Sequence, residues 1–251
     1  MNKFLGKKIN FIMIGLINIA LFHYAIFRLW FFLNDSSGRL QSDSLVFTLA
    51  IDALLLAFFS LPHSFLLDSK VKVKLLRYIP KSLYSTIYSL HACLGIILMD
   101  SFWVSFGPSL IDFSVGGELL ISAFYWISWI GMFWSMVATG LFRQSGIEEW
   151  WLTLKGKKIK NNLLHNGPYQ ICRHPIYASF LGMIWFSSHV SIDRLFLAFA
   201  WTAYIFIGAS LKERRLLRNK KYKEYSESTP AFPFLPKSID QFFMTKVWGL
   251  K

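Results

Sequence analysis

The feature that most constrains this chain is a series of apolar stretches, each long enough or nearly long enough to cross a lipid bilayer. A helix needs about 20 consecutive apolar residues to span the roughly 30 Å of hydrocarbon in a membrane. The stretches lie at residues 9–33, 45–67, 83–106, 118–142, 175–190 and 192–211. Composition agrees, because 54% of the 251 residues are hydrophobic and only 16% are charged, too few to cover a soluble fold. We therefore predict an all-α, polytopic membrane helix bundle with about six transmembrane helices.

The last two apolar stretches are predicted to form a hairpin. They are separated only by the short polar segment SIDR. The stretch at 175–190 is at the short limit for a membrane crossing, so a tilted or partly re-entrant hairpin is also open. The stretch at 9–33 is longer than the apolar region of a signal peptide and lacks a small-x-small cleavage site, so we expect it to remain as a span.

The distribution of basic residues predicts the orientation of these spans. Lys and Arg gather in the cytoplasmic loops of membrane proteins. With six crossings and both termini in the cytoplasm, every long basic segment falls on the cytoplasmic side. Of the 27 basic residues, only Arg28, Arg39 and Arg194 fall elsewhere. The formal net charge of +13 then reflects loops and anionic headgroups, and we do not expect nucleic acid as a partner.

One polar stretch stands out against this apolar background, GPYQICRHPIY at residues 167–177. Its Gly-Pro pair signals a turn, and Pro175 suits the first turn of a helix, where a missing N–H costs nothing. Arg173 and His174 then precede a helix N-terminus, whose free N–H groups favour a bound anion. The same residues would also serve as a cytoplasmic anchor at the headgroups, with Tyr177 in an interfacial belt. The residues alone leave both interpretations open.

A second polar cluster follows the last apolar stretch. The segment LKERRLL at 211–217 continues that stretch, and YKEY follows at 222–225. A polybasic helix lying on anionic lipid accounts for most of these charges. It does not account for Glu213, an acid that either pairs with its basic neighbours or holds a hydroxyl or ammonium group of a ligand.

The two clusters together carry a family resemblance. The ordered set GPYxxxRHPxY, an apolar hairpin, ERxL, YKEY and PFLP, over about 163–236, resembles the C-terminal half of membrane methyltransferases related to isoprenylcysteine carboxyl methyltransferase and phospholipid N-methyltransferase. The upstream segments IDALLLAFFSLPHSFLL, KSLYSTIYSL and WLTLKGK are similar to the bacterial branch that contains the methanethiol S-methyltransferases. This resemblance implies an integral membrane enzyme that transfers a methyl group from S-adenosylmethionine to a thiol or another small or lipid-soluble acceptor, such as a methanethiol-like thiol or an isoprenylcysteine carboxylate.

The resemblance also implies which residues form the site. The residues expected to bind the cofactor, in a pocket that faces the cytoplasm, are Gly167, Tyr169, Arg173, His174, Pro175, Tyr177 and Glu213. Arg173 and His174 are also predicted to be catalytic. Arg173 would hold an anionic acceptor or the carboxylate of the cofactor, and His174 would take a proton from a thiol. No metal is expected, because Cys93 and Cys172 show no metal-ligand spacing.

Three departures from the family pattern keep other functions open. Lys212 stands where the family has a second Glu, Ser179 stands where it has Gly, and a Phe-Gly pair is missing between Leu217 and Tyr222. A non-catalytic membrane protein that retains the fold is therefore one alternative. A sterol-reductase-like NADPH enzyme is another, although no phosphate-binding sequence calls for a nicotinamide pocket.

These predictions divide the chain into three regions. Residues 1–142 form the N-terminal transmembrane helices, residues 143–236 form the cofactor-binding catalytic region with the terminal hairpin, and residues 237–251 form a C-terminal tail. The expected partners are membrane lipid and the methyl acceptor.

Overall fold

The computed structural model describes residues 2–34, 39–143, 145–157 and 166–242. Within them the chain is mainly helical, which confirms the predicted all-α membrane bundle in its class. The chain folds as two compact units, Met1–Pro108 with Gly140–Asn162, and Ser109–Thr139 with Leu163–Lys251. The predicted division at residues 142 and 236 separates regions by function rather than by compactness, and it stays a prediction. The predicted tail is described as far as Phe242, and residues 243–251 lie outside the described part.

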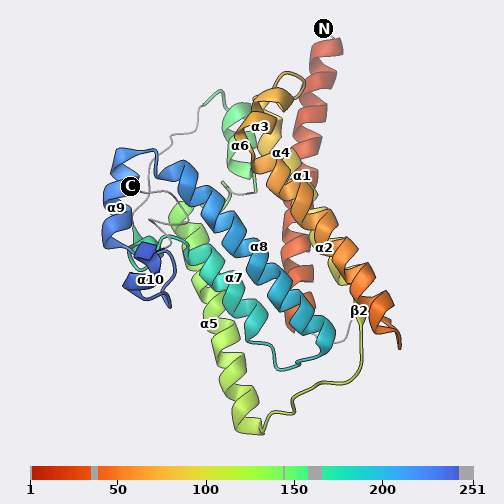
Figure 1. Cartoon of the computed structure of the whole chain (residues 1–251). Coiled ribbons are helices and arrows are strands. Elements are labelled where there is room, and N and C mark those ends of the chain that lie inside the picture. Colours follow the sequence, from red (N-terminus) through yellow and green to blue (C-terminus); the bar gives the residue numbers. More distant parts are fainter. Residues whose placement is uncertain (1, 35–38, 144, 158–165, 243–251) are drawn as a thin grey trace. The chain divides into compact units, whose positions relative to one another are not determined.

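The first unit is built around three long helices that run alongside one another (Figure 1). Helix α4 packs against both α1 and α2. The elements of this unit are α1 (Asn2–Asn34), β1 (Leu40–Gln41), α2 (Leu45–Leu67), α3 (Ser69–Leu75), α4 (Lys81–Phe102), β2 (Val104–Ser105) and α6 (Ile147–Leu154). The two short strands pair in parallel, with Leu40 opposite Val104. They are a small addition to the predicted all-α fold.

The second unit contains the helices that surround the polar stretch. Helix α7 packs against α5 and against α8, and the short 3₁₀ helix η1 packs against α5. The elements are α5 (Val115–Thr139), η1 (Gly167–Gln170), α7 (Pro175–Trp185), α8 (Ile192–Leu216), α9 (Lys220–Ser228) and α10 (Lys237–Phe242). In Figure 1, α7 and α8 lie beside α5, and α9 and α10 follow at the end of α8 that carries its C-terminus.

Burial on the long helices is inverted relative to a soluble protein. The buried residues of α2 are Thr48, Asp52, Leu56 and Phe59, which recur at helical spacing and include two polar side chains. Large apolar residues on other faces of the same helix are exposed, as at Val46, Leu54 and Leu61. Apolar residues favour an outer face only where the surrounding solvent is lipid, and intramembrane polar groups face the bundle interior. This pattern identifies an integral membrane protein.

Five helices within the described residues are long and apolar enough to span a membrane. They cover Ile9–Asn34, Leu45–Leu67, Leu83–Phe102, Val115–Thr139 and Ile192–Leu216. The remaining predicted stretch, at 175–190, forms only the 11-residue helix α7, about 16 Å long at 1.5 Å per residue, and continues as a loop from Phe186. Helix α7 alone is therefore about half as long as the hydrocarbon layer is thick.

The candidate functional site

The polar stretch folds onto the segment that follows α9. The backbone N–H groups of Arg173 and His174 donate to the carbonyl oxygens of Pro230 and Ala231, at 2.8 and 3.0 Å. Gly167 has a φ of +62°, a backbone conformation that favours glycine. This turn and the two backbone bonds present Arg173 and His174 immediately before Pro175, which is the first residue of α7 as predicted. The local structure therefore follows from the Gly-Pro and Pro positions in the sequence.

The side chain of Arg173 forms a buried ion-pair cluster with two acids. Its Nε and Nη2 each lie 3.2 Å from an oxygen of Glu213, and its Nη1 lies 3.1 Å from Oδ2 of Asp240. Nη1 also donates to the carbonyl oxygens of Ser226 and Thr229. The side chains of Arg173 and Glu213 have no exposed surface, and that of Asp240 is 5% exposed. The cluster is thus part of the interior of the second unit.

His174 lies on the same carboxylate. Its Nε2 is 2.8 Å from Oε1 of Glu213, and Tyr222 donates its hydroxyl to the same oxygen at 2.5 Å. Within the described residues, both ring nitrogens of His174 are buried without a hydrogen bond of good geometry, so Nε2 meets Glu213 at close range but not in good alignment, and Nδ1 has no polar neighbour of this kind. A ring nitrogen beside a carboxylate carries the proton, so Nδ1 is left as the acceptor of a neutral imidazole.

Burial sets the protonation of these groups. Burial lowers the pKa of His174, and the carboxylate of Glu213 only partly opposes this; the imidazole is therefore neutral at pH 7. Burial also tends to lower the pKa of Arg173, but Glu213 and Asp240 outweigh it and the pKa is raised. The pKa of Tyr222 is raised by burial and by the charge of Glu213, so its phenol remains a proton donor.

Aromatic rings surround the imidazole. The ring of Tyr177 stacks on that of His174 with centroids 5.4 Å apart, and the ring of Phe232 lies 5.6 Å away. Tyr169 lies in η1, where its carbonyl oxygen accepts a hydrogen bond from Tyr225, and burial raises the pKa of its phenol to about 12. The two Tyr residues of the YKEY motif therefore have distinct partners, Glu213 for the first and the η1 turn for the second.

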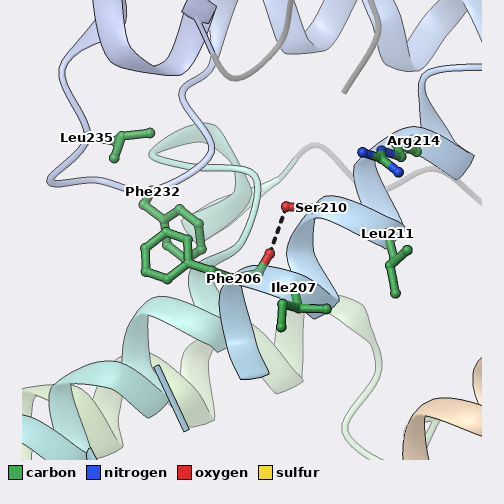
Figure 2. Close-up of a pocket in the computed structure, with 7 residues that line it drawn as sticks. All are labelled: Phe206, Ile207, Ser210, Leu211, Arg214, Phe232 and Leu235. Atoms are coloured by element: carbon green, nitrogen blue, oxygen red, sulfur yellow. Dashed lines mark hydrogen bonds between the residues drawn. The ribbon is translucent and has the colours of Figure 1, made fainter. Parts of the chain in front are cut away.

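An apolar pocket of about 370 Å³ opens beside Phe232. Figure 2 shows the residues that line it, Phe206, Ile207, Ser210, Leu211, Arg214, Phe232 and Leu235. Ser210 donates its hydroxyl to the carbonyl oxygen of Phe206 at 2.8 Å, which leaves Arg214 as the charged residue of the lining. The ring of Phe232 lines the pocket and also contacts the imidazole of His174. The pocket and the Arg173 cluster are therefore separated by a single ring.

The structure brings the predicted residues together. Arg173, His174 and Glu213 meet within 3.2 Å, and Gly167, Tyr169, Pro175 and Tyr177 occupy the turn and helix start around them. Sequence reasoning missed Asp240, which pairs with Arg173 and accepts the backbone N–H of Ala231 at 3.1 Å. Asp240 is the sole acid among the last fifteen residues of the chain, but the neighbouring sequence does not indicate that it pairs with Arg173.

The fold defines the class of polytopic membrane proteins, and the relatives of the chain are consistent with the isoprenylcysteine carboxyl methyltransferase-like branch of that class. Within that class, the predicted resemblance to methanethiol S-methyltransferases is confirmed. The chain is 27% identical over 212 residues to the methanethiol S-methyltransferase of Crocosphaera subtropica, covering 82% of this chain and 83% of that protein.

Two further relatives are similar to the chain over most of its length. The methanethiol S-methyltransferase of Pseudomonas deceptionensis is 26% identical over 189 residues, 72% of this chain and 70% of that protein. Nurim of Xenopus laevis is 29% identical over 169 residues, 62% of this chain and 58% of that protein. No protein-family model and no solved structure matches the chain.

Proposed function

We propose that this protein is an integral membrane methyltransferase that uses S-adenosylmethionine to methylate a thiol or another small or lipophilic acceptor. The observation that carries the proposal is the convergence of Arg173, His174 and Glu213 at one buried point, in a chain similar over most of its length to methanethiol S-methyltransferases. We also propose that the site faces the cytoplasm, because the basic segments around it satisfy the positive-inside rule.

The residues present fit such a cofactor. The ring of Phe232 lines the apolar pocket and would offer a flat apolar surface to an adenine, and Nδ1 of His174 is a buried acceptor without a partner in the described structure. The Arg173 cluster contains two carboxylates and one guanidinium, so with a neutral His174 it carries a net negative charge. That sign favours a cationic ligand such as a sulfonium.

In this proposal the chain excludes water from the site and accepts one proton, and the cofactor supplies the reactive methyl group. S-adenosylmethionine, when bound, supplies an electrophilic methyl group on a positively charged sulfur. The buried surroundings exclude water, which favours a reaction in which opposite charges are cancelled. Nδ1 of His174 can accept the proton of a thiol, and Glu213 holds the ring in the tautomer that makes Nδ1 the acceptor.

The contacts favour positioning roles for Arg173 and Glu213. Both side chains are fully enclosed and bonded to each other, and Arg173 also ties down the segment after α9 through Ser226 and Thr229. Direct contact of Arg173 with the cofactor carboxylate, and of Glu213 with its ribose or amino group, stays a prediction from the family resemblance. Gly167, Tyr169 and Pro175 would shape the pocket through the turn and the helix start.

A methyl-transfer assay with isotopically labelled cofactor tests the proposal. Purified protein in detergent is offered methanethiol, a prenylated cysteine and an ethanolamine lipid in parallel. We expect label on the thiol, and we expect a His174→Gln variant to lose at least tenfold in rate while His189→Gln, a change in the loop after α7, leaves the rate within twofold. Folded protein that labels none of the three acceptors would count against the proposal.

One observation favours a second candidate, a non-catalytic membrane protein. The complete burial of the Arg173 cluster is also what a purely structural ion pair produces. The two candidates differ in ligand binding, because only the enzyme requires affinity for S-adenosylhomocysteine, the product form of the cofactor. Binding of NADPH in its place would instead support the reductase alternative.

A further inference from the structure

Lys212 lies beside the site but outside the Arg173 cluster. It precedes Glu213 in α8, and successive residues of a helix point about 100° apart. Glu213 continues the buried row formed by Ile205 and Ala209, whereas Lys212 shares its face with Gly208, four residues earlier. The hydroxyl of Tyr177 lies 4.0 Å from the position of a Cβ at Gly208. The side chain of Lys212 therefore lies on the face of α8 that approaches Tyr177 of α7.

The ammonium of Lys212 faces an aromatic ring rather than an acid. Its Nζ lies 5.3 Å from the centroid of the Tyr177 ring, and the side chain is partly buried. Across the described residues, no carboxylate lies within 4 Å of this ammonium. The charges that act on it most are Glu213, which already pairs with Arg173, and the like charge of Arg215.

This arrangement contrasts with that of Arg173. Arg173 has two carboxylates for one positive charge, whereas Lys212 has a ring and, among the residues that the structure describes, no acid within ion-pair distance. A ring face stabilises a cation by only part of what a carboxylate provides, and a partly buried ammonium without an anion is costly. The arrangement is what a site provides when the matching anion arrives with a ligand.

We propose that Lys212 binds an anionic group brought in by the reactants, an inference that rests on the proposed methyltransferase function. Two groups have the required chemistry, the carboxylate of the methionine part of S-adenosylmethionine and the thiolate of the acceptor. In the first case Lys212 determines cofactor affinity. In the second it holds the acceptor in its nucleophilic form, because a nearby positive charge lowers the pKa of a thiol.

Calorimetric titration separates the two sources. The ligands are S-adenosylhomocysteine and 5′-methylthioadenosine, which keeps the nucleoside and the thioether but lacks the amino-acid carboxylate. If Lys212 binds that carboxylate, Lys212→Met weakens S-adenosylhomocysteine binding at least tenfold and changes 5′-methylthioadenosine binding less than twofold. Lys212→Arg should restore most of the affinity, and Lys221→Met, at an exposed lysine of α9, should change neither ligand.

A pH profile tests the second source. If Lys212 holds the thiolate, Lys212→Met leaves both titrations unchanged, and the pH at which kcat for methanethiol reaches half its maximum rises by about one unit. Either result supports the inference. Unchanged titrations together with an unchanged profile overturn it and leave the proposed function standing. Wild-type protein that binds no S-adenosylhomocysteine overturns both. Melting temperatures confirm that the variants are folded, since Met replaces a partly buried charge with an apolar chain of similar length.

Discussion

Arg173 lies at the centre of a buried ion-pair cluster in the second unit. One guanidinium satisfies two carboxylates and two backbone carbonyls, with no exposed side-chain surface. Removing one partner of a buried ion pair leaves an uncompensated charge, which costs about 3–5 kcal/mol. We therefore expect Arg173→Met to lower the free energy of unfolding by that amount, measured by chemical denaturation in detergent micelles.

A matched change provides the control for Arg173. Arg143 also pairs with an acid, Glu148, but both side chains are about one-third exposed, and such pairs contribute less than about 1 kcal/mol. Arg143→Met should therefore be nearly neutral. Equal losses in the two variants would show that the burial of the Arg173 cluster is not what stabilises it.

His174 gives the stability a pH dependence. The unfolded imidazole has a pKa near 6.5, and burial lowers the pKa in the folded state, so the unfolded chain binds more protons between the two values. Stability is fully present above about pH 6.5 and is lost as the pH falls below it. We expect the melting temperature of wild type to fall between pH 6.5 and 5 more steeply than that of His174→Gln. Parallel curves would contradict a buried neutral imidazole.

At the scale of single residues, the sequence was enough to identify the residues of the polar motif. It was not enough to identify the residues that pair with them. Arg173, His174 and Glu213 could be singled out because they stand out against an apolar chain and match the ordered motif of the family that the sequence resembles. Asp240 could not, because nothing local indicates that an acid 67 residues after Arg173 returns to pair with it. The network of hydrogen bonds, rather than the choice of residues, needed the structure.

Helix boundaries show which local signals are strong. Helix α2 matches its predicted range, since Ser44 caps its start by accepting the N–H of Phe47 and Asp68 follows its end. Helix α7 stops at Trp185 instead of continuing to position 190, because the polar residues Ser187, Ser188 and His189 follow. Hydropathy averaged over a window of residues does not resolve such an end.

A pair of glycines tests how α6 is joined to α4 in the first unit. Gly146 and Gly107 both have positive φ, +73° and +69°, so alanine at either position costs about 1–2 kcal/mol in backbone strain. A Cβ at Gly146 would also lie 2.6 Å from the backbone of Ser85 in α4, whereas one at Gly107 meets nothing within 4 Å. Gly146→Ala should therefore lower the melting temperature clearly more than Gly107→Ala. Equal shifts would mean that α6 does not approach α4 this closely.

For the whole molecule, the sequence predicted the class of fold because lipid and water select opposite surfaces. Exposed residues such as Leu61 and buried ones such as Asp52 follow from that rule alone. The division into two units does not follow from it, because α5 joins the second unit while the segment after it, from Gly140, returns to the first. Apolar composition cannot say which helices pack together.

The predicted orientation can be tested by cysteine labelling. Cys93 and Cys172 are both buried, so an introduced cysteine at an exposed position provides the signal. We expect a cysteine at Asp112 to react with a membrane-impermeant reagent in intact cells, and one at Lys221 to react only after the membrane is opened. Both positions are exposed in the structure. Labelling of both from the same side would contradict the placement of the site at the cytoplasmic face.

The most direct measurement is a calorimetric titration of the purified, folded protein with S-adenosylhomocysteine. The buried meeting of Arg173, His174 and Glu213 beside the rings of Tyr177 and Phe232 predicts saturable binding at one site per chain. Binding should weaken at least tenfold in Tyr177→Leu, which removes the ring but keeps the charge cluster. Folded wild-type protein that releases no heat with this ligand, in a preparation whose melting is cooperative, would contradict the assignment of a cofactor site.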